Sequence, residues 1–292
     1  MTVQQAFESF LVEQQIRGNS PKTLTYYQSG MNRFRGFLER NPTLPELNLP
    51  LLREYVLHLQ AEDLSTVTRQ SYIRALWAFL TWCYSEDLLP VNLSEKFKLP
   101  KAKRKVIDIL TDEEARRLMS SFNPRYLIQL RNYCICALML DSGLRMDEVS
   151  TLDLSLLHLP EGYAIVNGKG NKQRVVPLGL NARKALLRYL NRRPGCASTG
   201  RVFLKSDLQP ISDSTIKQMF RKLKKRVGIP RIRAHLLRHT FATRYLENGG
   251  DIYALQQILG HTSLEMVKRY VHSTHQKTVS KFSEYSPLDH LL

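Results

Sequence analysis

The chain has 292 residues, of which 43% are hydrophobic, and this is enough for two domains of ordinary size with a core each. No apolar run approaches the roughly 20 residues that span a bilayer, and the first residues lack the pattern of a secretory signal, so we expect a cytoplasmic protein rather than a membrane or secreted one. The formal net charge of +17 favours a polyanionic partner, because every phosphate that a basic residue neutralises releases counterions.

The basic residues are unevenly distributed along the chain. Residues 1–98 contain 10 basic and 10 acidic side chains, whereas residues 99–292 contain 33 basic and 16 acidic ones. The whole excess of positive charge therefore lies in the second part. A ribosomal or chromatin protein with solvated basic faces would show a similar charge, so charge alone does not identify the function.

The first part of the chain is predicted to be a four-helix domain over residues 1–98. Ser20 and Pro21 supply an N-cap and a first-turn proline, and "NPTLPELNLP" reads as a connector between the second and third helices. Amphipathic spacing predicts helices over residues 3–17, 21–40, 51–62 and 65–86.

A basic stretch separates the two parts. We expect an extended linker over residues 99–107, which is either solvated or lies along a nucleic-acid backbone. Its basic residues are Lys101, Lys103, Arg104 and Lys105.

Residues 108–292 are predicted to form a mainly helical domain with a small antiparallel β-sheet. The capping box "TDEE" at Thr111 begins a helix, and "YAIVN" and "RVVPL" flank the turn "GKGNKQ" as a hairpin. Cys134 and Cys136 lie in an apolar run and are expected to be buried as free thiols; with Cys83 and Cys196 they show no spacing typical of a disulfide or a zinc site.

A second basic segment follows the hairpin. The helix that opens at Ser212 or Asp213 is too basic on several faces to be an ordinary core helix, and we expect it to contact phosphates and the major groove; the alternative is a solvated basic helix. Its basic residues are Lys217, Arg221, Lys222, Lys224, Lys225 and Arg226.

Two short motifs in this part contain charged residues at suggestive spacing. Arg145 and Glu148 are three residues apart and share one helix face, where they form either a surface ion pair or part of a site. Lys169 and Lys172 stand in the glycine-rich hairpin turn, from which a lysine with a lowered pKa can protonate a leaving oxygen; the alternative is an ordinary polar turn.

Several groups able to bind or protonate a phosphate gather near the end of the chain. His235 and Arg238 lie one helical turn apart, and the following helix begins after Asp251 and ends at Gly260. His261 is then expected at a helix N-terminus, just before the capping box "TSLE", with Tyr270 in that helix.

Individually these residues have structural explanations. His239 could be a hydrogen-bonded core histidine, and Tyr245 and Tyr253 read as packing aromatics. As an ordered set, the two arginines, the donors and the one hydroxyl are what a phosphoryl transfer site needs.

In this order the motifs "SGLRMDEV", "NGKGNKQRVVPLG", "HLLRHTFAT" and "LGHTSLEMVKRYVH" resemble the tyrosine site-specific recombinases, or phage-type integrases, and most closely their Xer-type members. The N-terminal "SPKTLTYYQSGMNRFRGFL" is similar to the start of that family's core-binding, SAM-like domain. The resemblance covers nearly the whole chain. The motifs include none of the additional N-terminal module that larger integrases carry, so we expect a recombinase of the simple two-domain type.

The resemblance implies that Tyr270 is the nucleophile and that Glu148 supports the pocket, in which Lys169 is the general acid and Lys172 the reserve candidate. The remaining pocket residues would be Arg145, His235, Arg238 and His261. It also implies a metal-free, ATP-free transesterification of DNA through a 3′-phosphotyrosyl bond and a Holliday junction, with no cofactor. A type IB topoisomerase-like enzyme and a non-catalytic DNA-binding protein are the alternatives.

The implied partner is double-stranded DNA with inverted-repeat recombination sites. Four protomers would act on two sites, as a homotetramer or as a heterotetramer with a second recombinase. The implied location is the bacterial cytoplasm, at the nucleoid. The apolar stripe in the tail, residues 276–292, is expected to dock on a neighbouring protomer or to fold back on its own domain.

Overall fold

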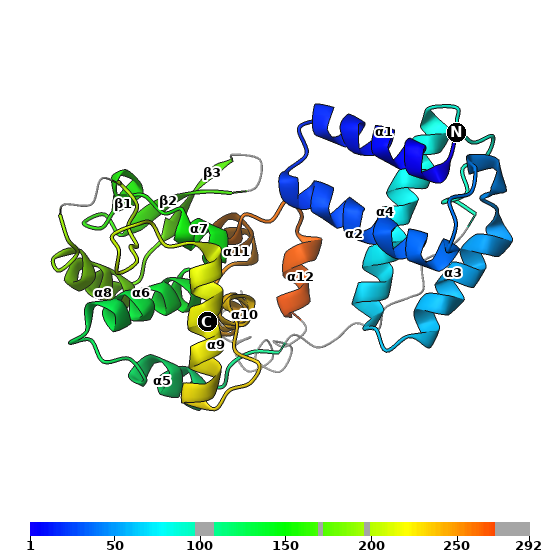
Figure 1. Cartoon of the computed structure of the whole chain (residues 1–292). Coiled ribbons are helices and arrows are strands. Elements are labelled where there is room, and N and C mark those ends of the chain that lie inside the picture. The colour runs from blue at the N-terminus through cyan, green and yellow to red at the C-terminus, as the bar shows by residue number, and fades with distance from the viewer. Residues whose placement is uncertain (97–107, 169–171, 196–198, 272–292) are drawn as a thin grey trace, which may run out of the picture. The chain divides into compact units, whose positions relative to one another are not determined.

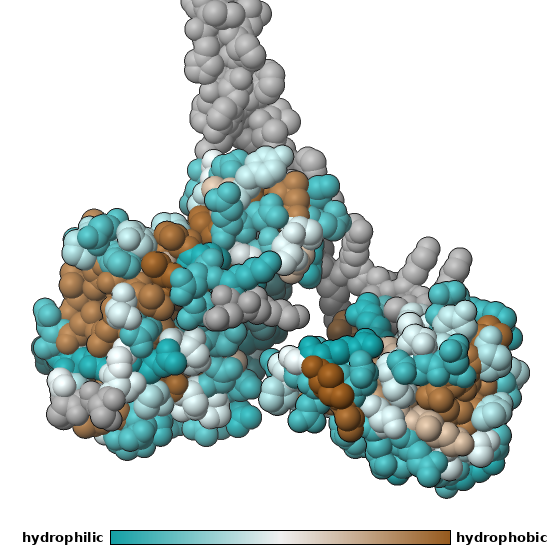
Figure 2. Space-filling model, turned by 90° about the horizontal axis from the view of Figure 1, so that it is seen from above, coloured by the Kyte–Doolittle hydropathy of each residue, from teal (hydrophilic) through white to brown (hydrophobic). Residues whose placement is uncertain are grey.

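A computed structural model describes residues 1–96, 108–168, 172–195 and 199–271, which belong to two compact units, Met1–Lys105 and Val106–Leu292 (Figure 1). The expected linker, residues 99–107, and the tail, residues 276–292, lie outside the described residues. Most of the surface visible in Figure 2 is hydrophilic, with separate apolar patches. In the part of the chain that the structure describes, no helix is long and apolar enough to cross a membrane.

The N-terminal unit contains the four predicted helices. They are α1 (Val3–Ile16), α2 (Pro21–Leu38), α3 (Leu49–Ala61) and α4 (Thr66–Ser85). Each begins at a polar N-cap whose side-chain oxygen accepts a backbone N–H, as Ser20 does from Thr23 and Ser65 does from Thr68. The connector before α3 includes a short 3₁₀ turn, Leu44–Glu46.

Aromatic side chains fill the core of this unit. Phe10 and Phe79 are buried with ring centroids 5.8 Å apart in an edge arrangement, and Tyr55 packs on Phe34 in the same way at 4.9 Å. Helices α2 and α4 approach so closely that a Cβ at Gly30 would overlap the side chain of Ala75. The residue types of α2 therefore determine how near these two helices can lie.

The C-terminal unit is mainly helical with a small sheet, as predicted. Its helices are α5 (Asp112–Ser120), α6 (Leu127–Asp141), α7 (Met146–Ser150), α8 (Leu180–Leu190), α9 (Asp213–Val227), α10 (Ala234–Glu247), α11 (Ile252–Leu259) and α12 (Glu265–Val271). The strands are β1 (Leu157–His158), β2 (Tyr163–Asn167) and β3 (Gln173–Pro177), antiparallel in the order β1-β2-β3, with Ile165 opposite Val175. The hairpin is confirmed, and β1 adds a short edge strand after a 3₁₀ turn at Leu154–Leu156.

Helices α6 and α10 form the centre of this unit and pack on each other. Cys134 and Cys136 are buried in α6 as expected, and α8 packs on the same helix. Helix α10 also contacts α11 and α12, and α11 lies against β3 (Figure 1). The polar residues of α10 therefore face the ends of several elements rather than open solvent alone.

The start of α12 differs from the prediction. The capping box at Thr262 is wrong, because α12 begins at Glu265. Gln256 explains the difference: its carbonyl accepts from the amide of His261, and its side-chain amide donates to the carbonyl of His261. These bonds hold His261 in the turn that ends α11, and three residues separate it from the start of α12, so it does not stand at a helix N-terminus.

Helix α9 has two faces, which the sequence interpretation of a helix basic on several faces did not separate. Its apolar residues at helical spacing, among them Ile216, Phe220 and Leu223, are buried in the core. The six basic residues named above are all exposed. Of the two tyrosines expected to pack, Tyr245 lies against the core but Tyr253 is 62% exposed, so that expectation was wrong for Tyr253.

Candidate active site

A buried carboxylate stands at the centre of the candidate site. The side chain of Glu148, in α7, is fully buried and accepts hydrogen bonds from Nη1 of Arg145 at 2.7 Å and from the backbone N–H of Arg145 at 2.7 Å. Arg174, in β3, donates to both carboxylate oxygens, at 2.7 and 2.9 Å. Nη1 of Arg238, in α10, lies 4.0 Å from Oε2 of Glu148. The structure thus brings Arg145, Glu148 and Arg238 together, as expected from the resemblance, and adds Arg174.

The charges in this cluster do not cancel. Burial would raise the pKa of Glu148, but the hydrogen bonds and charge of Arg174, followed by those from Arg145, lower it below its ordinary value, so the carboxylate is ionised. Burial and the neighbouring charge of Arg145 lower the pKa of Arg238 to about 10, which still leaves it protonated at neutral pH. Three guanidinium groups surround one carboxylate, and the site is suited to an additional anion.

Arg238 is fixed by backbone carbonyls. Its Nη1 donates to the carbonyl of Gly143 at 2.6 Å, and its Nη2 donates to the carbonyl of Leu259 at 2.7 Å. Gly143 adopts φ 64°, and a Cβ there would overlap the ring of Phe241. Gly143 therefore allows the chain to turn two residues before Arg145, and the carbonyl of Gly143 faces Arg238.

His261 adjoins Arg238. Its Nε2 lies 3.3 Å from Nη2 of Arg238, and because a guanidinium only donates, Nε2 accepts. Burial and the charge of Arg238 lower the pKa of His261 to about 4, so that the ring is neutral at pH 7 with its proton on Nδ1. This Nδ1 is buried and has no hydrogen-bond partner among the described residues. It is a donor available to an anion.

Tyr270 lies in α12, which packs against α10. Tyr270 is only 4% exposed, and its oxygen is 2.9 Å from Nδ1 of His239. Burial raises the pKa of Tyr270, although the charges of Arg238, Arg269 and Arg145 act in the opposite direction. Burial and nearby positive groups lower the pKa of His239 to about 4, so that its neutral ring can accept the tyrosine proton.

His235 was expected in the same pocket as Tyr270. It is exposed one turn before His239, with the two rings 6.4 Å apart, and among the described residues it makes no hydrogen bond to Tyr270. Burial and the charges of Arg238 and Arg233 lower its pKa. It therefore lies near the arginine cluster but not in contact with the tyrosine oxygen.

Two residues of the site were missed by sequence reasoning. Arg174 follows the hairpin turn in "QRVVPL", and His239 directly follows Arg238 in "HLLRHT". The only sequence signal for either is its closeness to a motif already singled out. Lys169 lies outside the described residues, and Lys172 is exposed just before β3.

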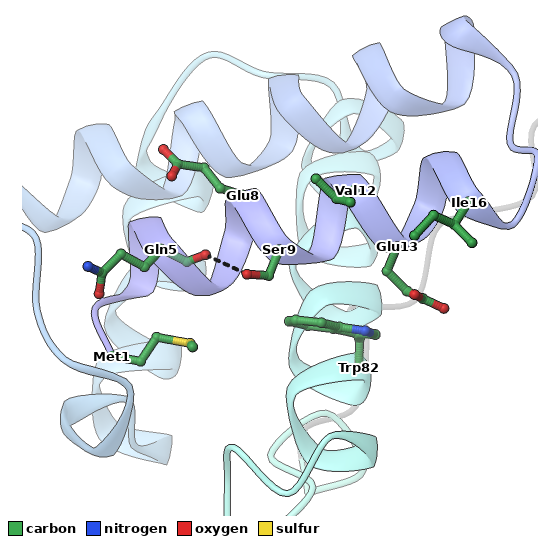
Figure 3. Close-up of a pocket in the computed structure, with 8 residues that line it drawn as sticks. All are labelled: Met1, Gln5, Glu8, Ser9, Val12, Glu13, Ile16 and Trp82. Carbon is green, nitrogen blue, oxygen red and sulfur yellow. Dashed lines mark hydrogen bonds between the residues drawn. The ribbon is translucent and has the colours of Figure 1, made fainter.

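A shallow hollow along α1 in the N-terminal unit does not suit the same chemistry (Figure 3). It is lined by Val12, Ile16 and Trp82 together with Glu8 and Glu13, and no lysine or arginine among the described residues lines it. Carboxylates repel a polyanion, so the arginine cluster is the candidate active site.

The chain is similar in sequence to known protein families and to individual proteins. The profile of the phage integrase family matches residues 108–277, and that of the phage integrase SAM-like domain matches residues 3–99. The chain is 29% identical to tyrosine recombinase XerC of Lactobacillus delbrueckii subsp. bulgaricus over 98% of this chain and 99% of that protein. It is 30% identical to tyrosine recombinase XerC of Thermodesulfovibrio yellowstonii over 93% of this chain and 92% of that protein.

The fold also matches a solved structure. The XerH site-specific recombinase bound to palindromic difH substrate, in a post-cleavage complex, superposes with a TM-score of 0.76 at 20% identity, covering 92% of this chain and 81% of that one. The integrase profile spans more than half of the chain and contains every residue of the arginine cluster, His239 and Tyr270. The chain therefore belongs to the phage integrase family and is a tyrosine recombinase.

Proposed function

We propose that this chain cleaves and rejoins DNA at specific sites, with Tyr270 as the nucleophile. The observation that carries the proposal is the buried hydroxyl of Tyr270, bonded to His239, on a helix packed against the one that holds Arg238. A hydroxyl beside a neutral base and a cluster of fixed cations is the arrangement that nucleophilic attack on a phosphodiester requires.

In the first step the oxygen of Tyr270 attacks the phosphorus and loses its proton to a neighbouring histidine. A 3′-phosphotyrosyl bond forms, and the bond to the 5′-oxygen breaks. Lys169 protonates that leaving oxygen, with Lys172 as the reserve candidate. Arg145 and Arg238 bind the nonbridging oxygens, with further donors from His235 and from Nδ1 of His261.

In the second step the 5′-hydroxyl of a partner strand attacks the phosphotyrosyl bond and releases Tyr270. The number of phosphoester bonds is conserved, so the chemistry requires neither ATP nor a metal ion. Two such exchanges pass through a Holliday junction and need four protomers on two DNA sites, as a homotetramer or with a second recombinase. The DNA sites would be inverted repeats at the bacterial nucleoid.

DNA would be held mainly by the exposed basic face of α9. This face projects several cations from a helix whose other face is anchored in the core, which suits phosphate and major-groove contact. Lys172 and the basic residues of the linker, residues 99–107, would extend this contact along the backbone. The neutral N-terminal unit, residues 1–98, would bind the opposite side of the DNA.

Covalent trapping tests the proposal. A suicide substrate with a nick beside the scissile phosphate should give a protein–DNA adduct with the wild-type protein, while Tyr270→Phe should bind the DNA equally well and give none. An adduct in Tyr270→Phe would place the nucleophile elsewhere. Sequence-dependent strand exchange between two sites, without relaxation of plasmids that lack a site, would exclude the topoisomerase-like alternative.

The tail, residues 276–292, would link the protomers. Its apolar residues form a stripe too short for a core of its own. Truncation after Lys277 should leave the melting temperature and single-site gel shifts unchanged but reduce synapsis and strand exchange. A large fall in melting temperature would instead indicate a tail folded on its own domain.

A further inference from the structure

Three arginines donate to three consecutive carbonyls where α11 ends. Arg174 Nε binds the carbonyl of Ile258 at 2.7 Å, Arg238 Nη2 binds that of Leu259 at 2.7 Å, and Arg145 Nη2 binds that of Gly260 at 3.3 Å. The last carbonyls of a helix lack intrahelical partners and carry the negative end of its dipole. The end of α11 is thus a shared anchor for guanidinium groups from three other segments.

Arg174 differs from the other two in that each of its three side-chain nitrogens donates to an oxygen of this cluster. Nε is bound to Ile258, and Nη1 and Nη2 each donate to one oxygen of Glu148. Its side chain is 12% exposed, whereas that of Arg145 is 26% exposed. The side chain of Arg238 is only 5% exposed, so hydrogen bonding rather than exposure distinguishes Arg174: each of its three nitrogens already donates to a protein oxygen.

We infer that Arg174 is a positioning residue, which fixes Glu148 and the end of α11 so that Arg145 and Arg238 are held in place for the phosphate. This inference rests on the proposed function for the role of Arg145 and Arg238. It assigns to Arg174 no contact with DNA.

The physical basis is the buried charge of Glu148. Without Arg174 this carboxylate would lose two of its hydrogen bonds, and the nearest cations to replace them are Arg145, already bonded, and Arg238, 4.0 Å away. Either guanidinium would have to turn toward Glu148 and away from the phosphate. Arg238 would also have to leave the carbonyls of Gly143 and Leu259.

Lysine cannot replace Arg174 in this arrangement. A planar guanidinium donates to two carboxylate oxygens and to a carbonyl on its other edge, whereas an ammonium is a compact charge at one point. Arg174→Lys therefore keeps the charge but removes the positioning. Arg193→Lys is a matched control, since Arg193 is also partly buried and donates to the carbonyls of Thr199, Arg201 and Val202, outside the cluster.

The experiment measures the cleavage rate of fully bound suicide substrate, the dissociation constant for DNA and the melting temperature for each variant. Arg174→Lys should bind DNA like the wild type but cleave it about 10² times more slowly, as for other small displacements of catalytic groups. Arg193→Lys should lose stability to a similar extent and cleave at the wild-type rate. Wild-type cleavage by Arg174→Lys would overturn the inference.

A double-mutant cycle separates positioning from direct contact. If Arg174 acts through Glu148, Arg174→Lys combined with Glu148→Gln should be no slower than Glu148→Gln alone. If the double variant is slowed by the product of the two single-variant factors, Arg174 acts independently of Glu148, which overturns the inference. If Arg174→Lys does not fold, the double variant Arg174→Met with Glu148→Met replaces the buried pair by apolar side chains; near-normal cleavage by that variant would be equally contradictory.

The salt dependence of DNA binding tests the inference even if no cleavage is seen. A phosphate contact contributes about 0.9 to the slope of log K against log salt. Arg174→Gln should leave the slope unchanged, and a fall of that size would overturn the inference. Absence of an adduct with the wild-type protein would count against the proposed function instead.

Discussion

The oxygen of Tyr270 lies 2.9 Å from Nδ1 of His239, and not beside His235, which precedes His239 by one turn of α10. Both histidines are on the helix that holds Arg238. Under the proposed mechanism the contact favours His239 as the proton acceptor for Tyr270, whereas His235 is exposed on the same helix.

The two histidines can be separated by kinetics. His239→Gln should slow cleavage of bound DNA by about 10²-fold and move the rate optimum to higher pH, because Tyr270 must then ionise without a base. His235→Gln is the matched variant and should slow cleavage without moving the optimum. The measurement is single-turnover cleavage from about pH 6 to about pH 10, a range that extends to the ordinary tyrosine pKa of about 10. A pH optimum shifted in His235→Gln but not in His239→Gln would identify His235 as the proton acceptor.

Arg145 and Arg238 should differ in their structural roles. Alanine at either position should slow cleavage by about 10²–10³-fold, as for loss of a fixed donor to a developing charge. Arg238→Ala should also lower the free energy of unfolding, by about 1–3 kcal/mol for each carbonyl left unpaired at Gly143 and Leu259, and Arg145→Ala should lower it by removing a hydrogen bond from Glu148 and one from the carbonyl of Gly260. Chemical denaturation of both variants checks this, and wild-type stability of Arg238→Ala would show that its two carbonyls find other partners.

Gly260 should be required for the rate as well as for the fold. It adopts φ 61°, and a Cβ there would lie 3.0 Å from Cδ and 3.1 Å from Nε of Arg174. Gly228, at the end of α9, has φ 64° with nothing within 4 Å of its Cβ position. Alanine should cost about 1–2 kcal/mol of stability at both positions, while only Gly260→Ala should also slow cleavage. Equal cleavage rates in the two variants would contradict a role for this close approach.

The general acid can be identified by chemical rescue. If Lys169 protonates the leaving 5′-oxygen, a 5′-bridging phosphorothioate, whose sulfur leaves without a proton, should restore cleavage by Lys169→Ala. Lys172→Ala should cleave the ordinary substrate at nearly the wild-type rate. Rescue of Lys172→Ala but not of Lys169→Ala would reverse the assignment.

Stability should fall in mild acid. The pKa of His239 and of His261 is lowered to about 4 in the folded protein, from an ordinary value of 6.5, by burial and by nearby cations. The unfolded chain therefore binds more protons between these values. The contribution of each ring is fully present above pH 6.5 and is lost as the pH falls toward 4, with a slope of at most about 1.4 kcal/mol per pH unit, reduced by partial exposure.

Thermal unfolding from pH 4 to 7 measures this dependence. The melting temperature of the double variant His239→Gln with His261→Gln should depend less on pH than that of the wild type. Glutamine does not bind a proton in this range, which lies around the ordinary histidine pKa of about 6.5. An unchanged profile would mean that other groups control the acid sensitivity.

The sequence by itself determined the features that depend on neighbours a few residues apart. The caps at Ser20, Thr111 and Asp251, the hairpin and the pair of Arg145 with Glu148 were all predicted, and each is a local hydrogen bond or turn. Local geometry is fixed once the residue types and their spacing are known, and the ordered motifs were specific enough to indicate the family.

Only the tertiary structure decided how these pieces meet. Arg174 binds Glu148 across 26 residues, and Tyr270 binds His239 across 31. His235 and His239 lie on one helix, so the choice between them depends on how α12 packs against α10 and cannot be read from their spacing. In the same way the start of α12 was mispredicted, because Gln256 binds the backbone of His261 in preference to a local cap at Thr262. Packing between distant segments decides such contacts, since several local arrangements have similar free energies until the core selects one.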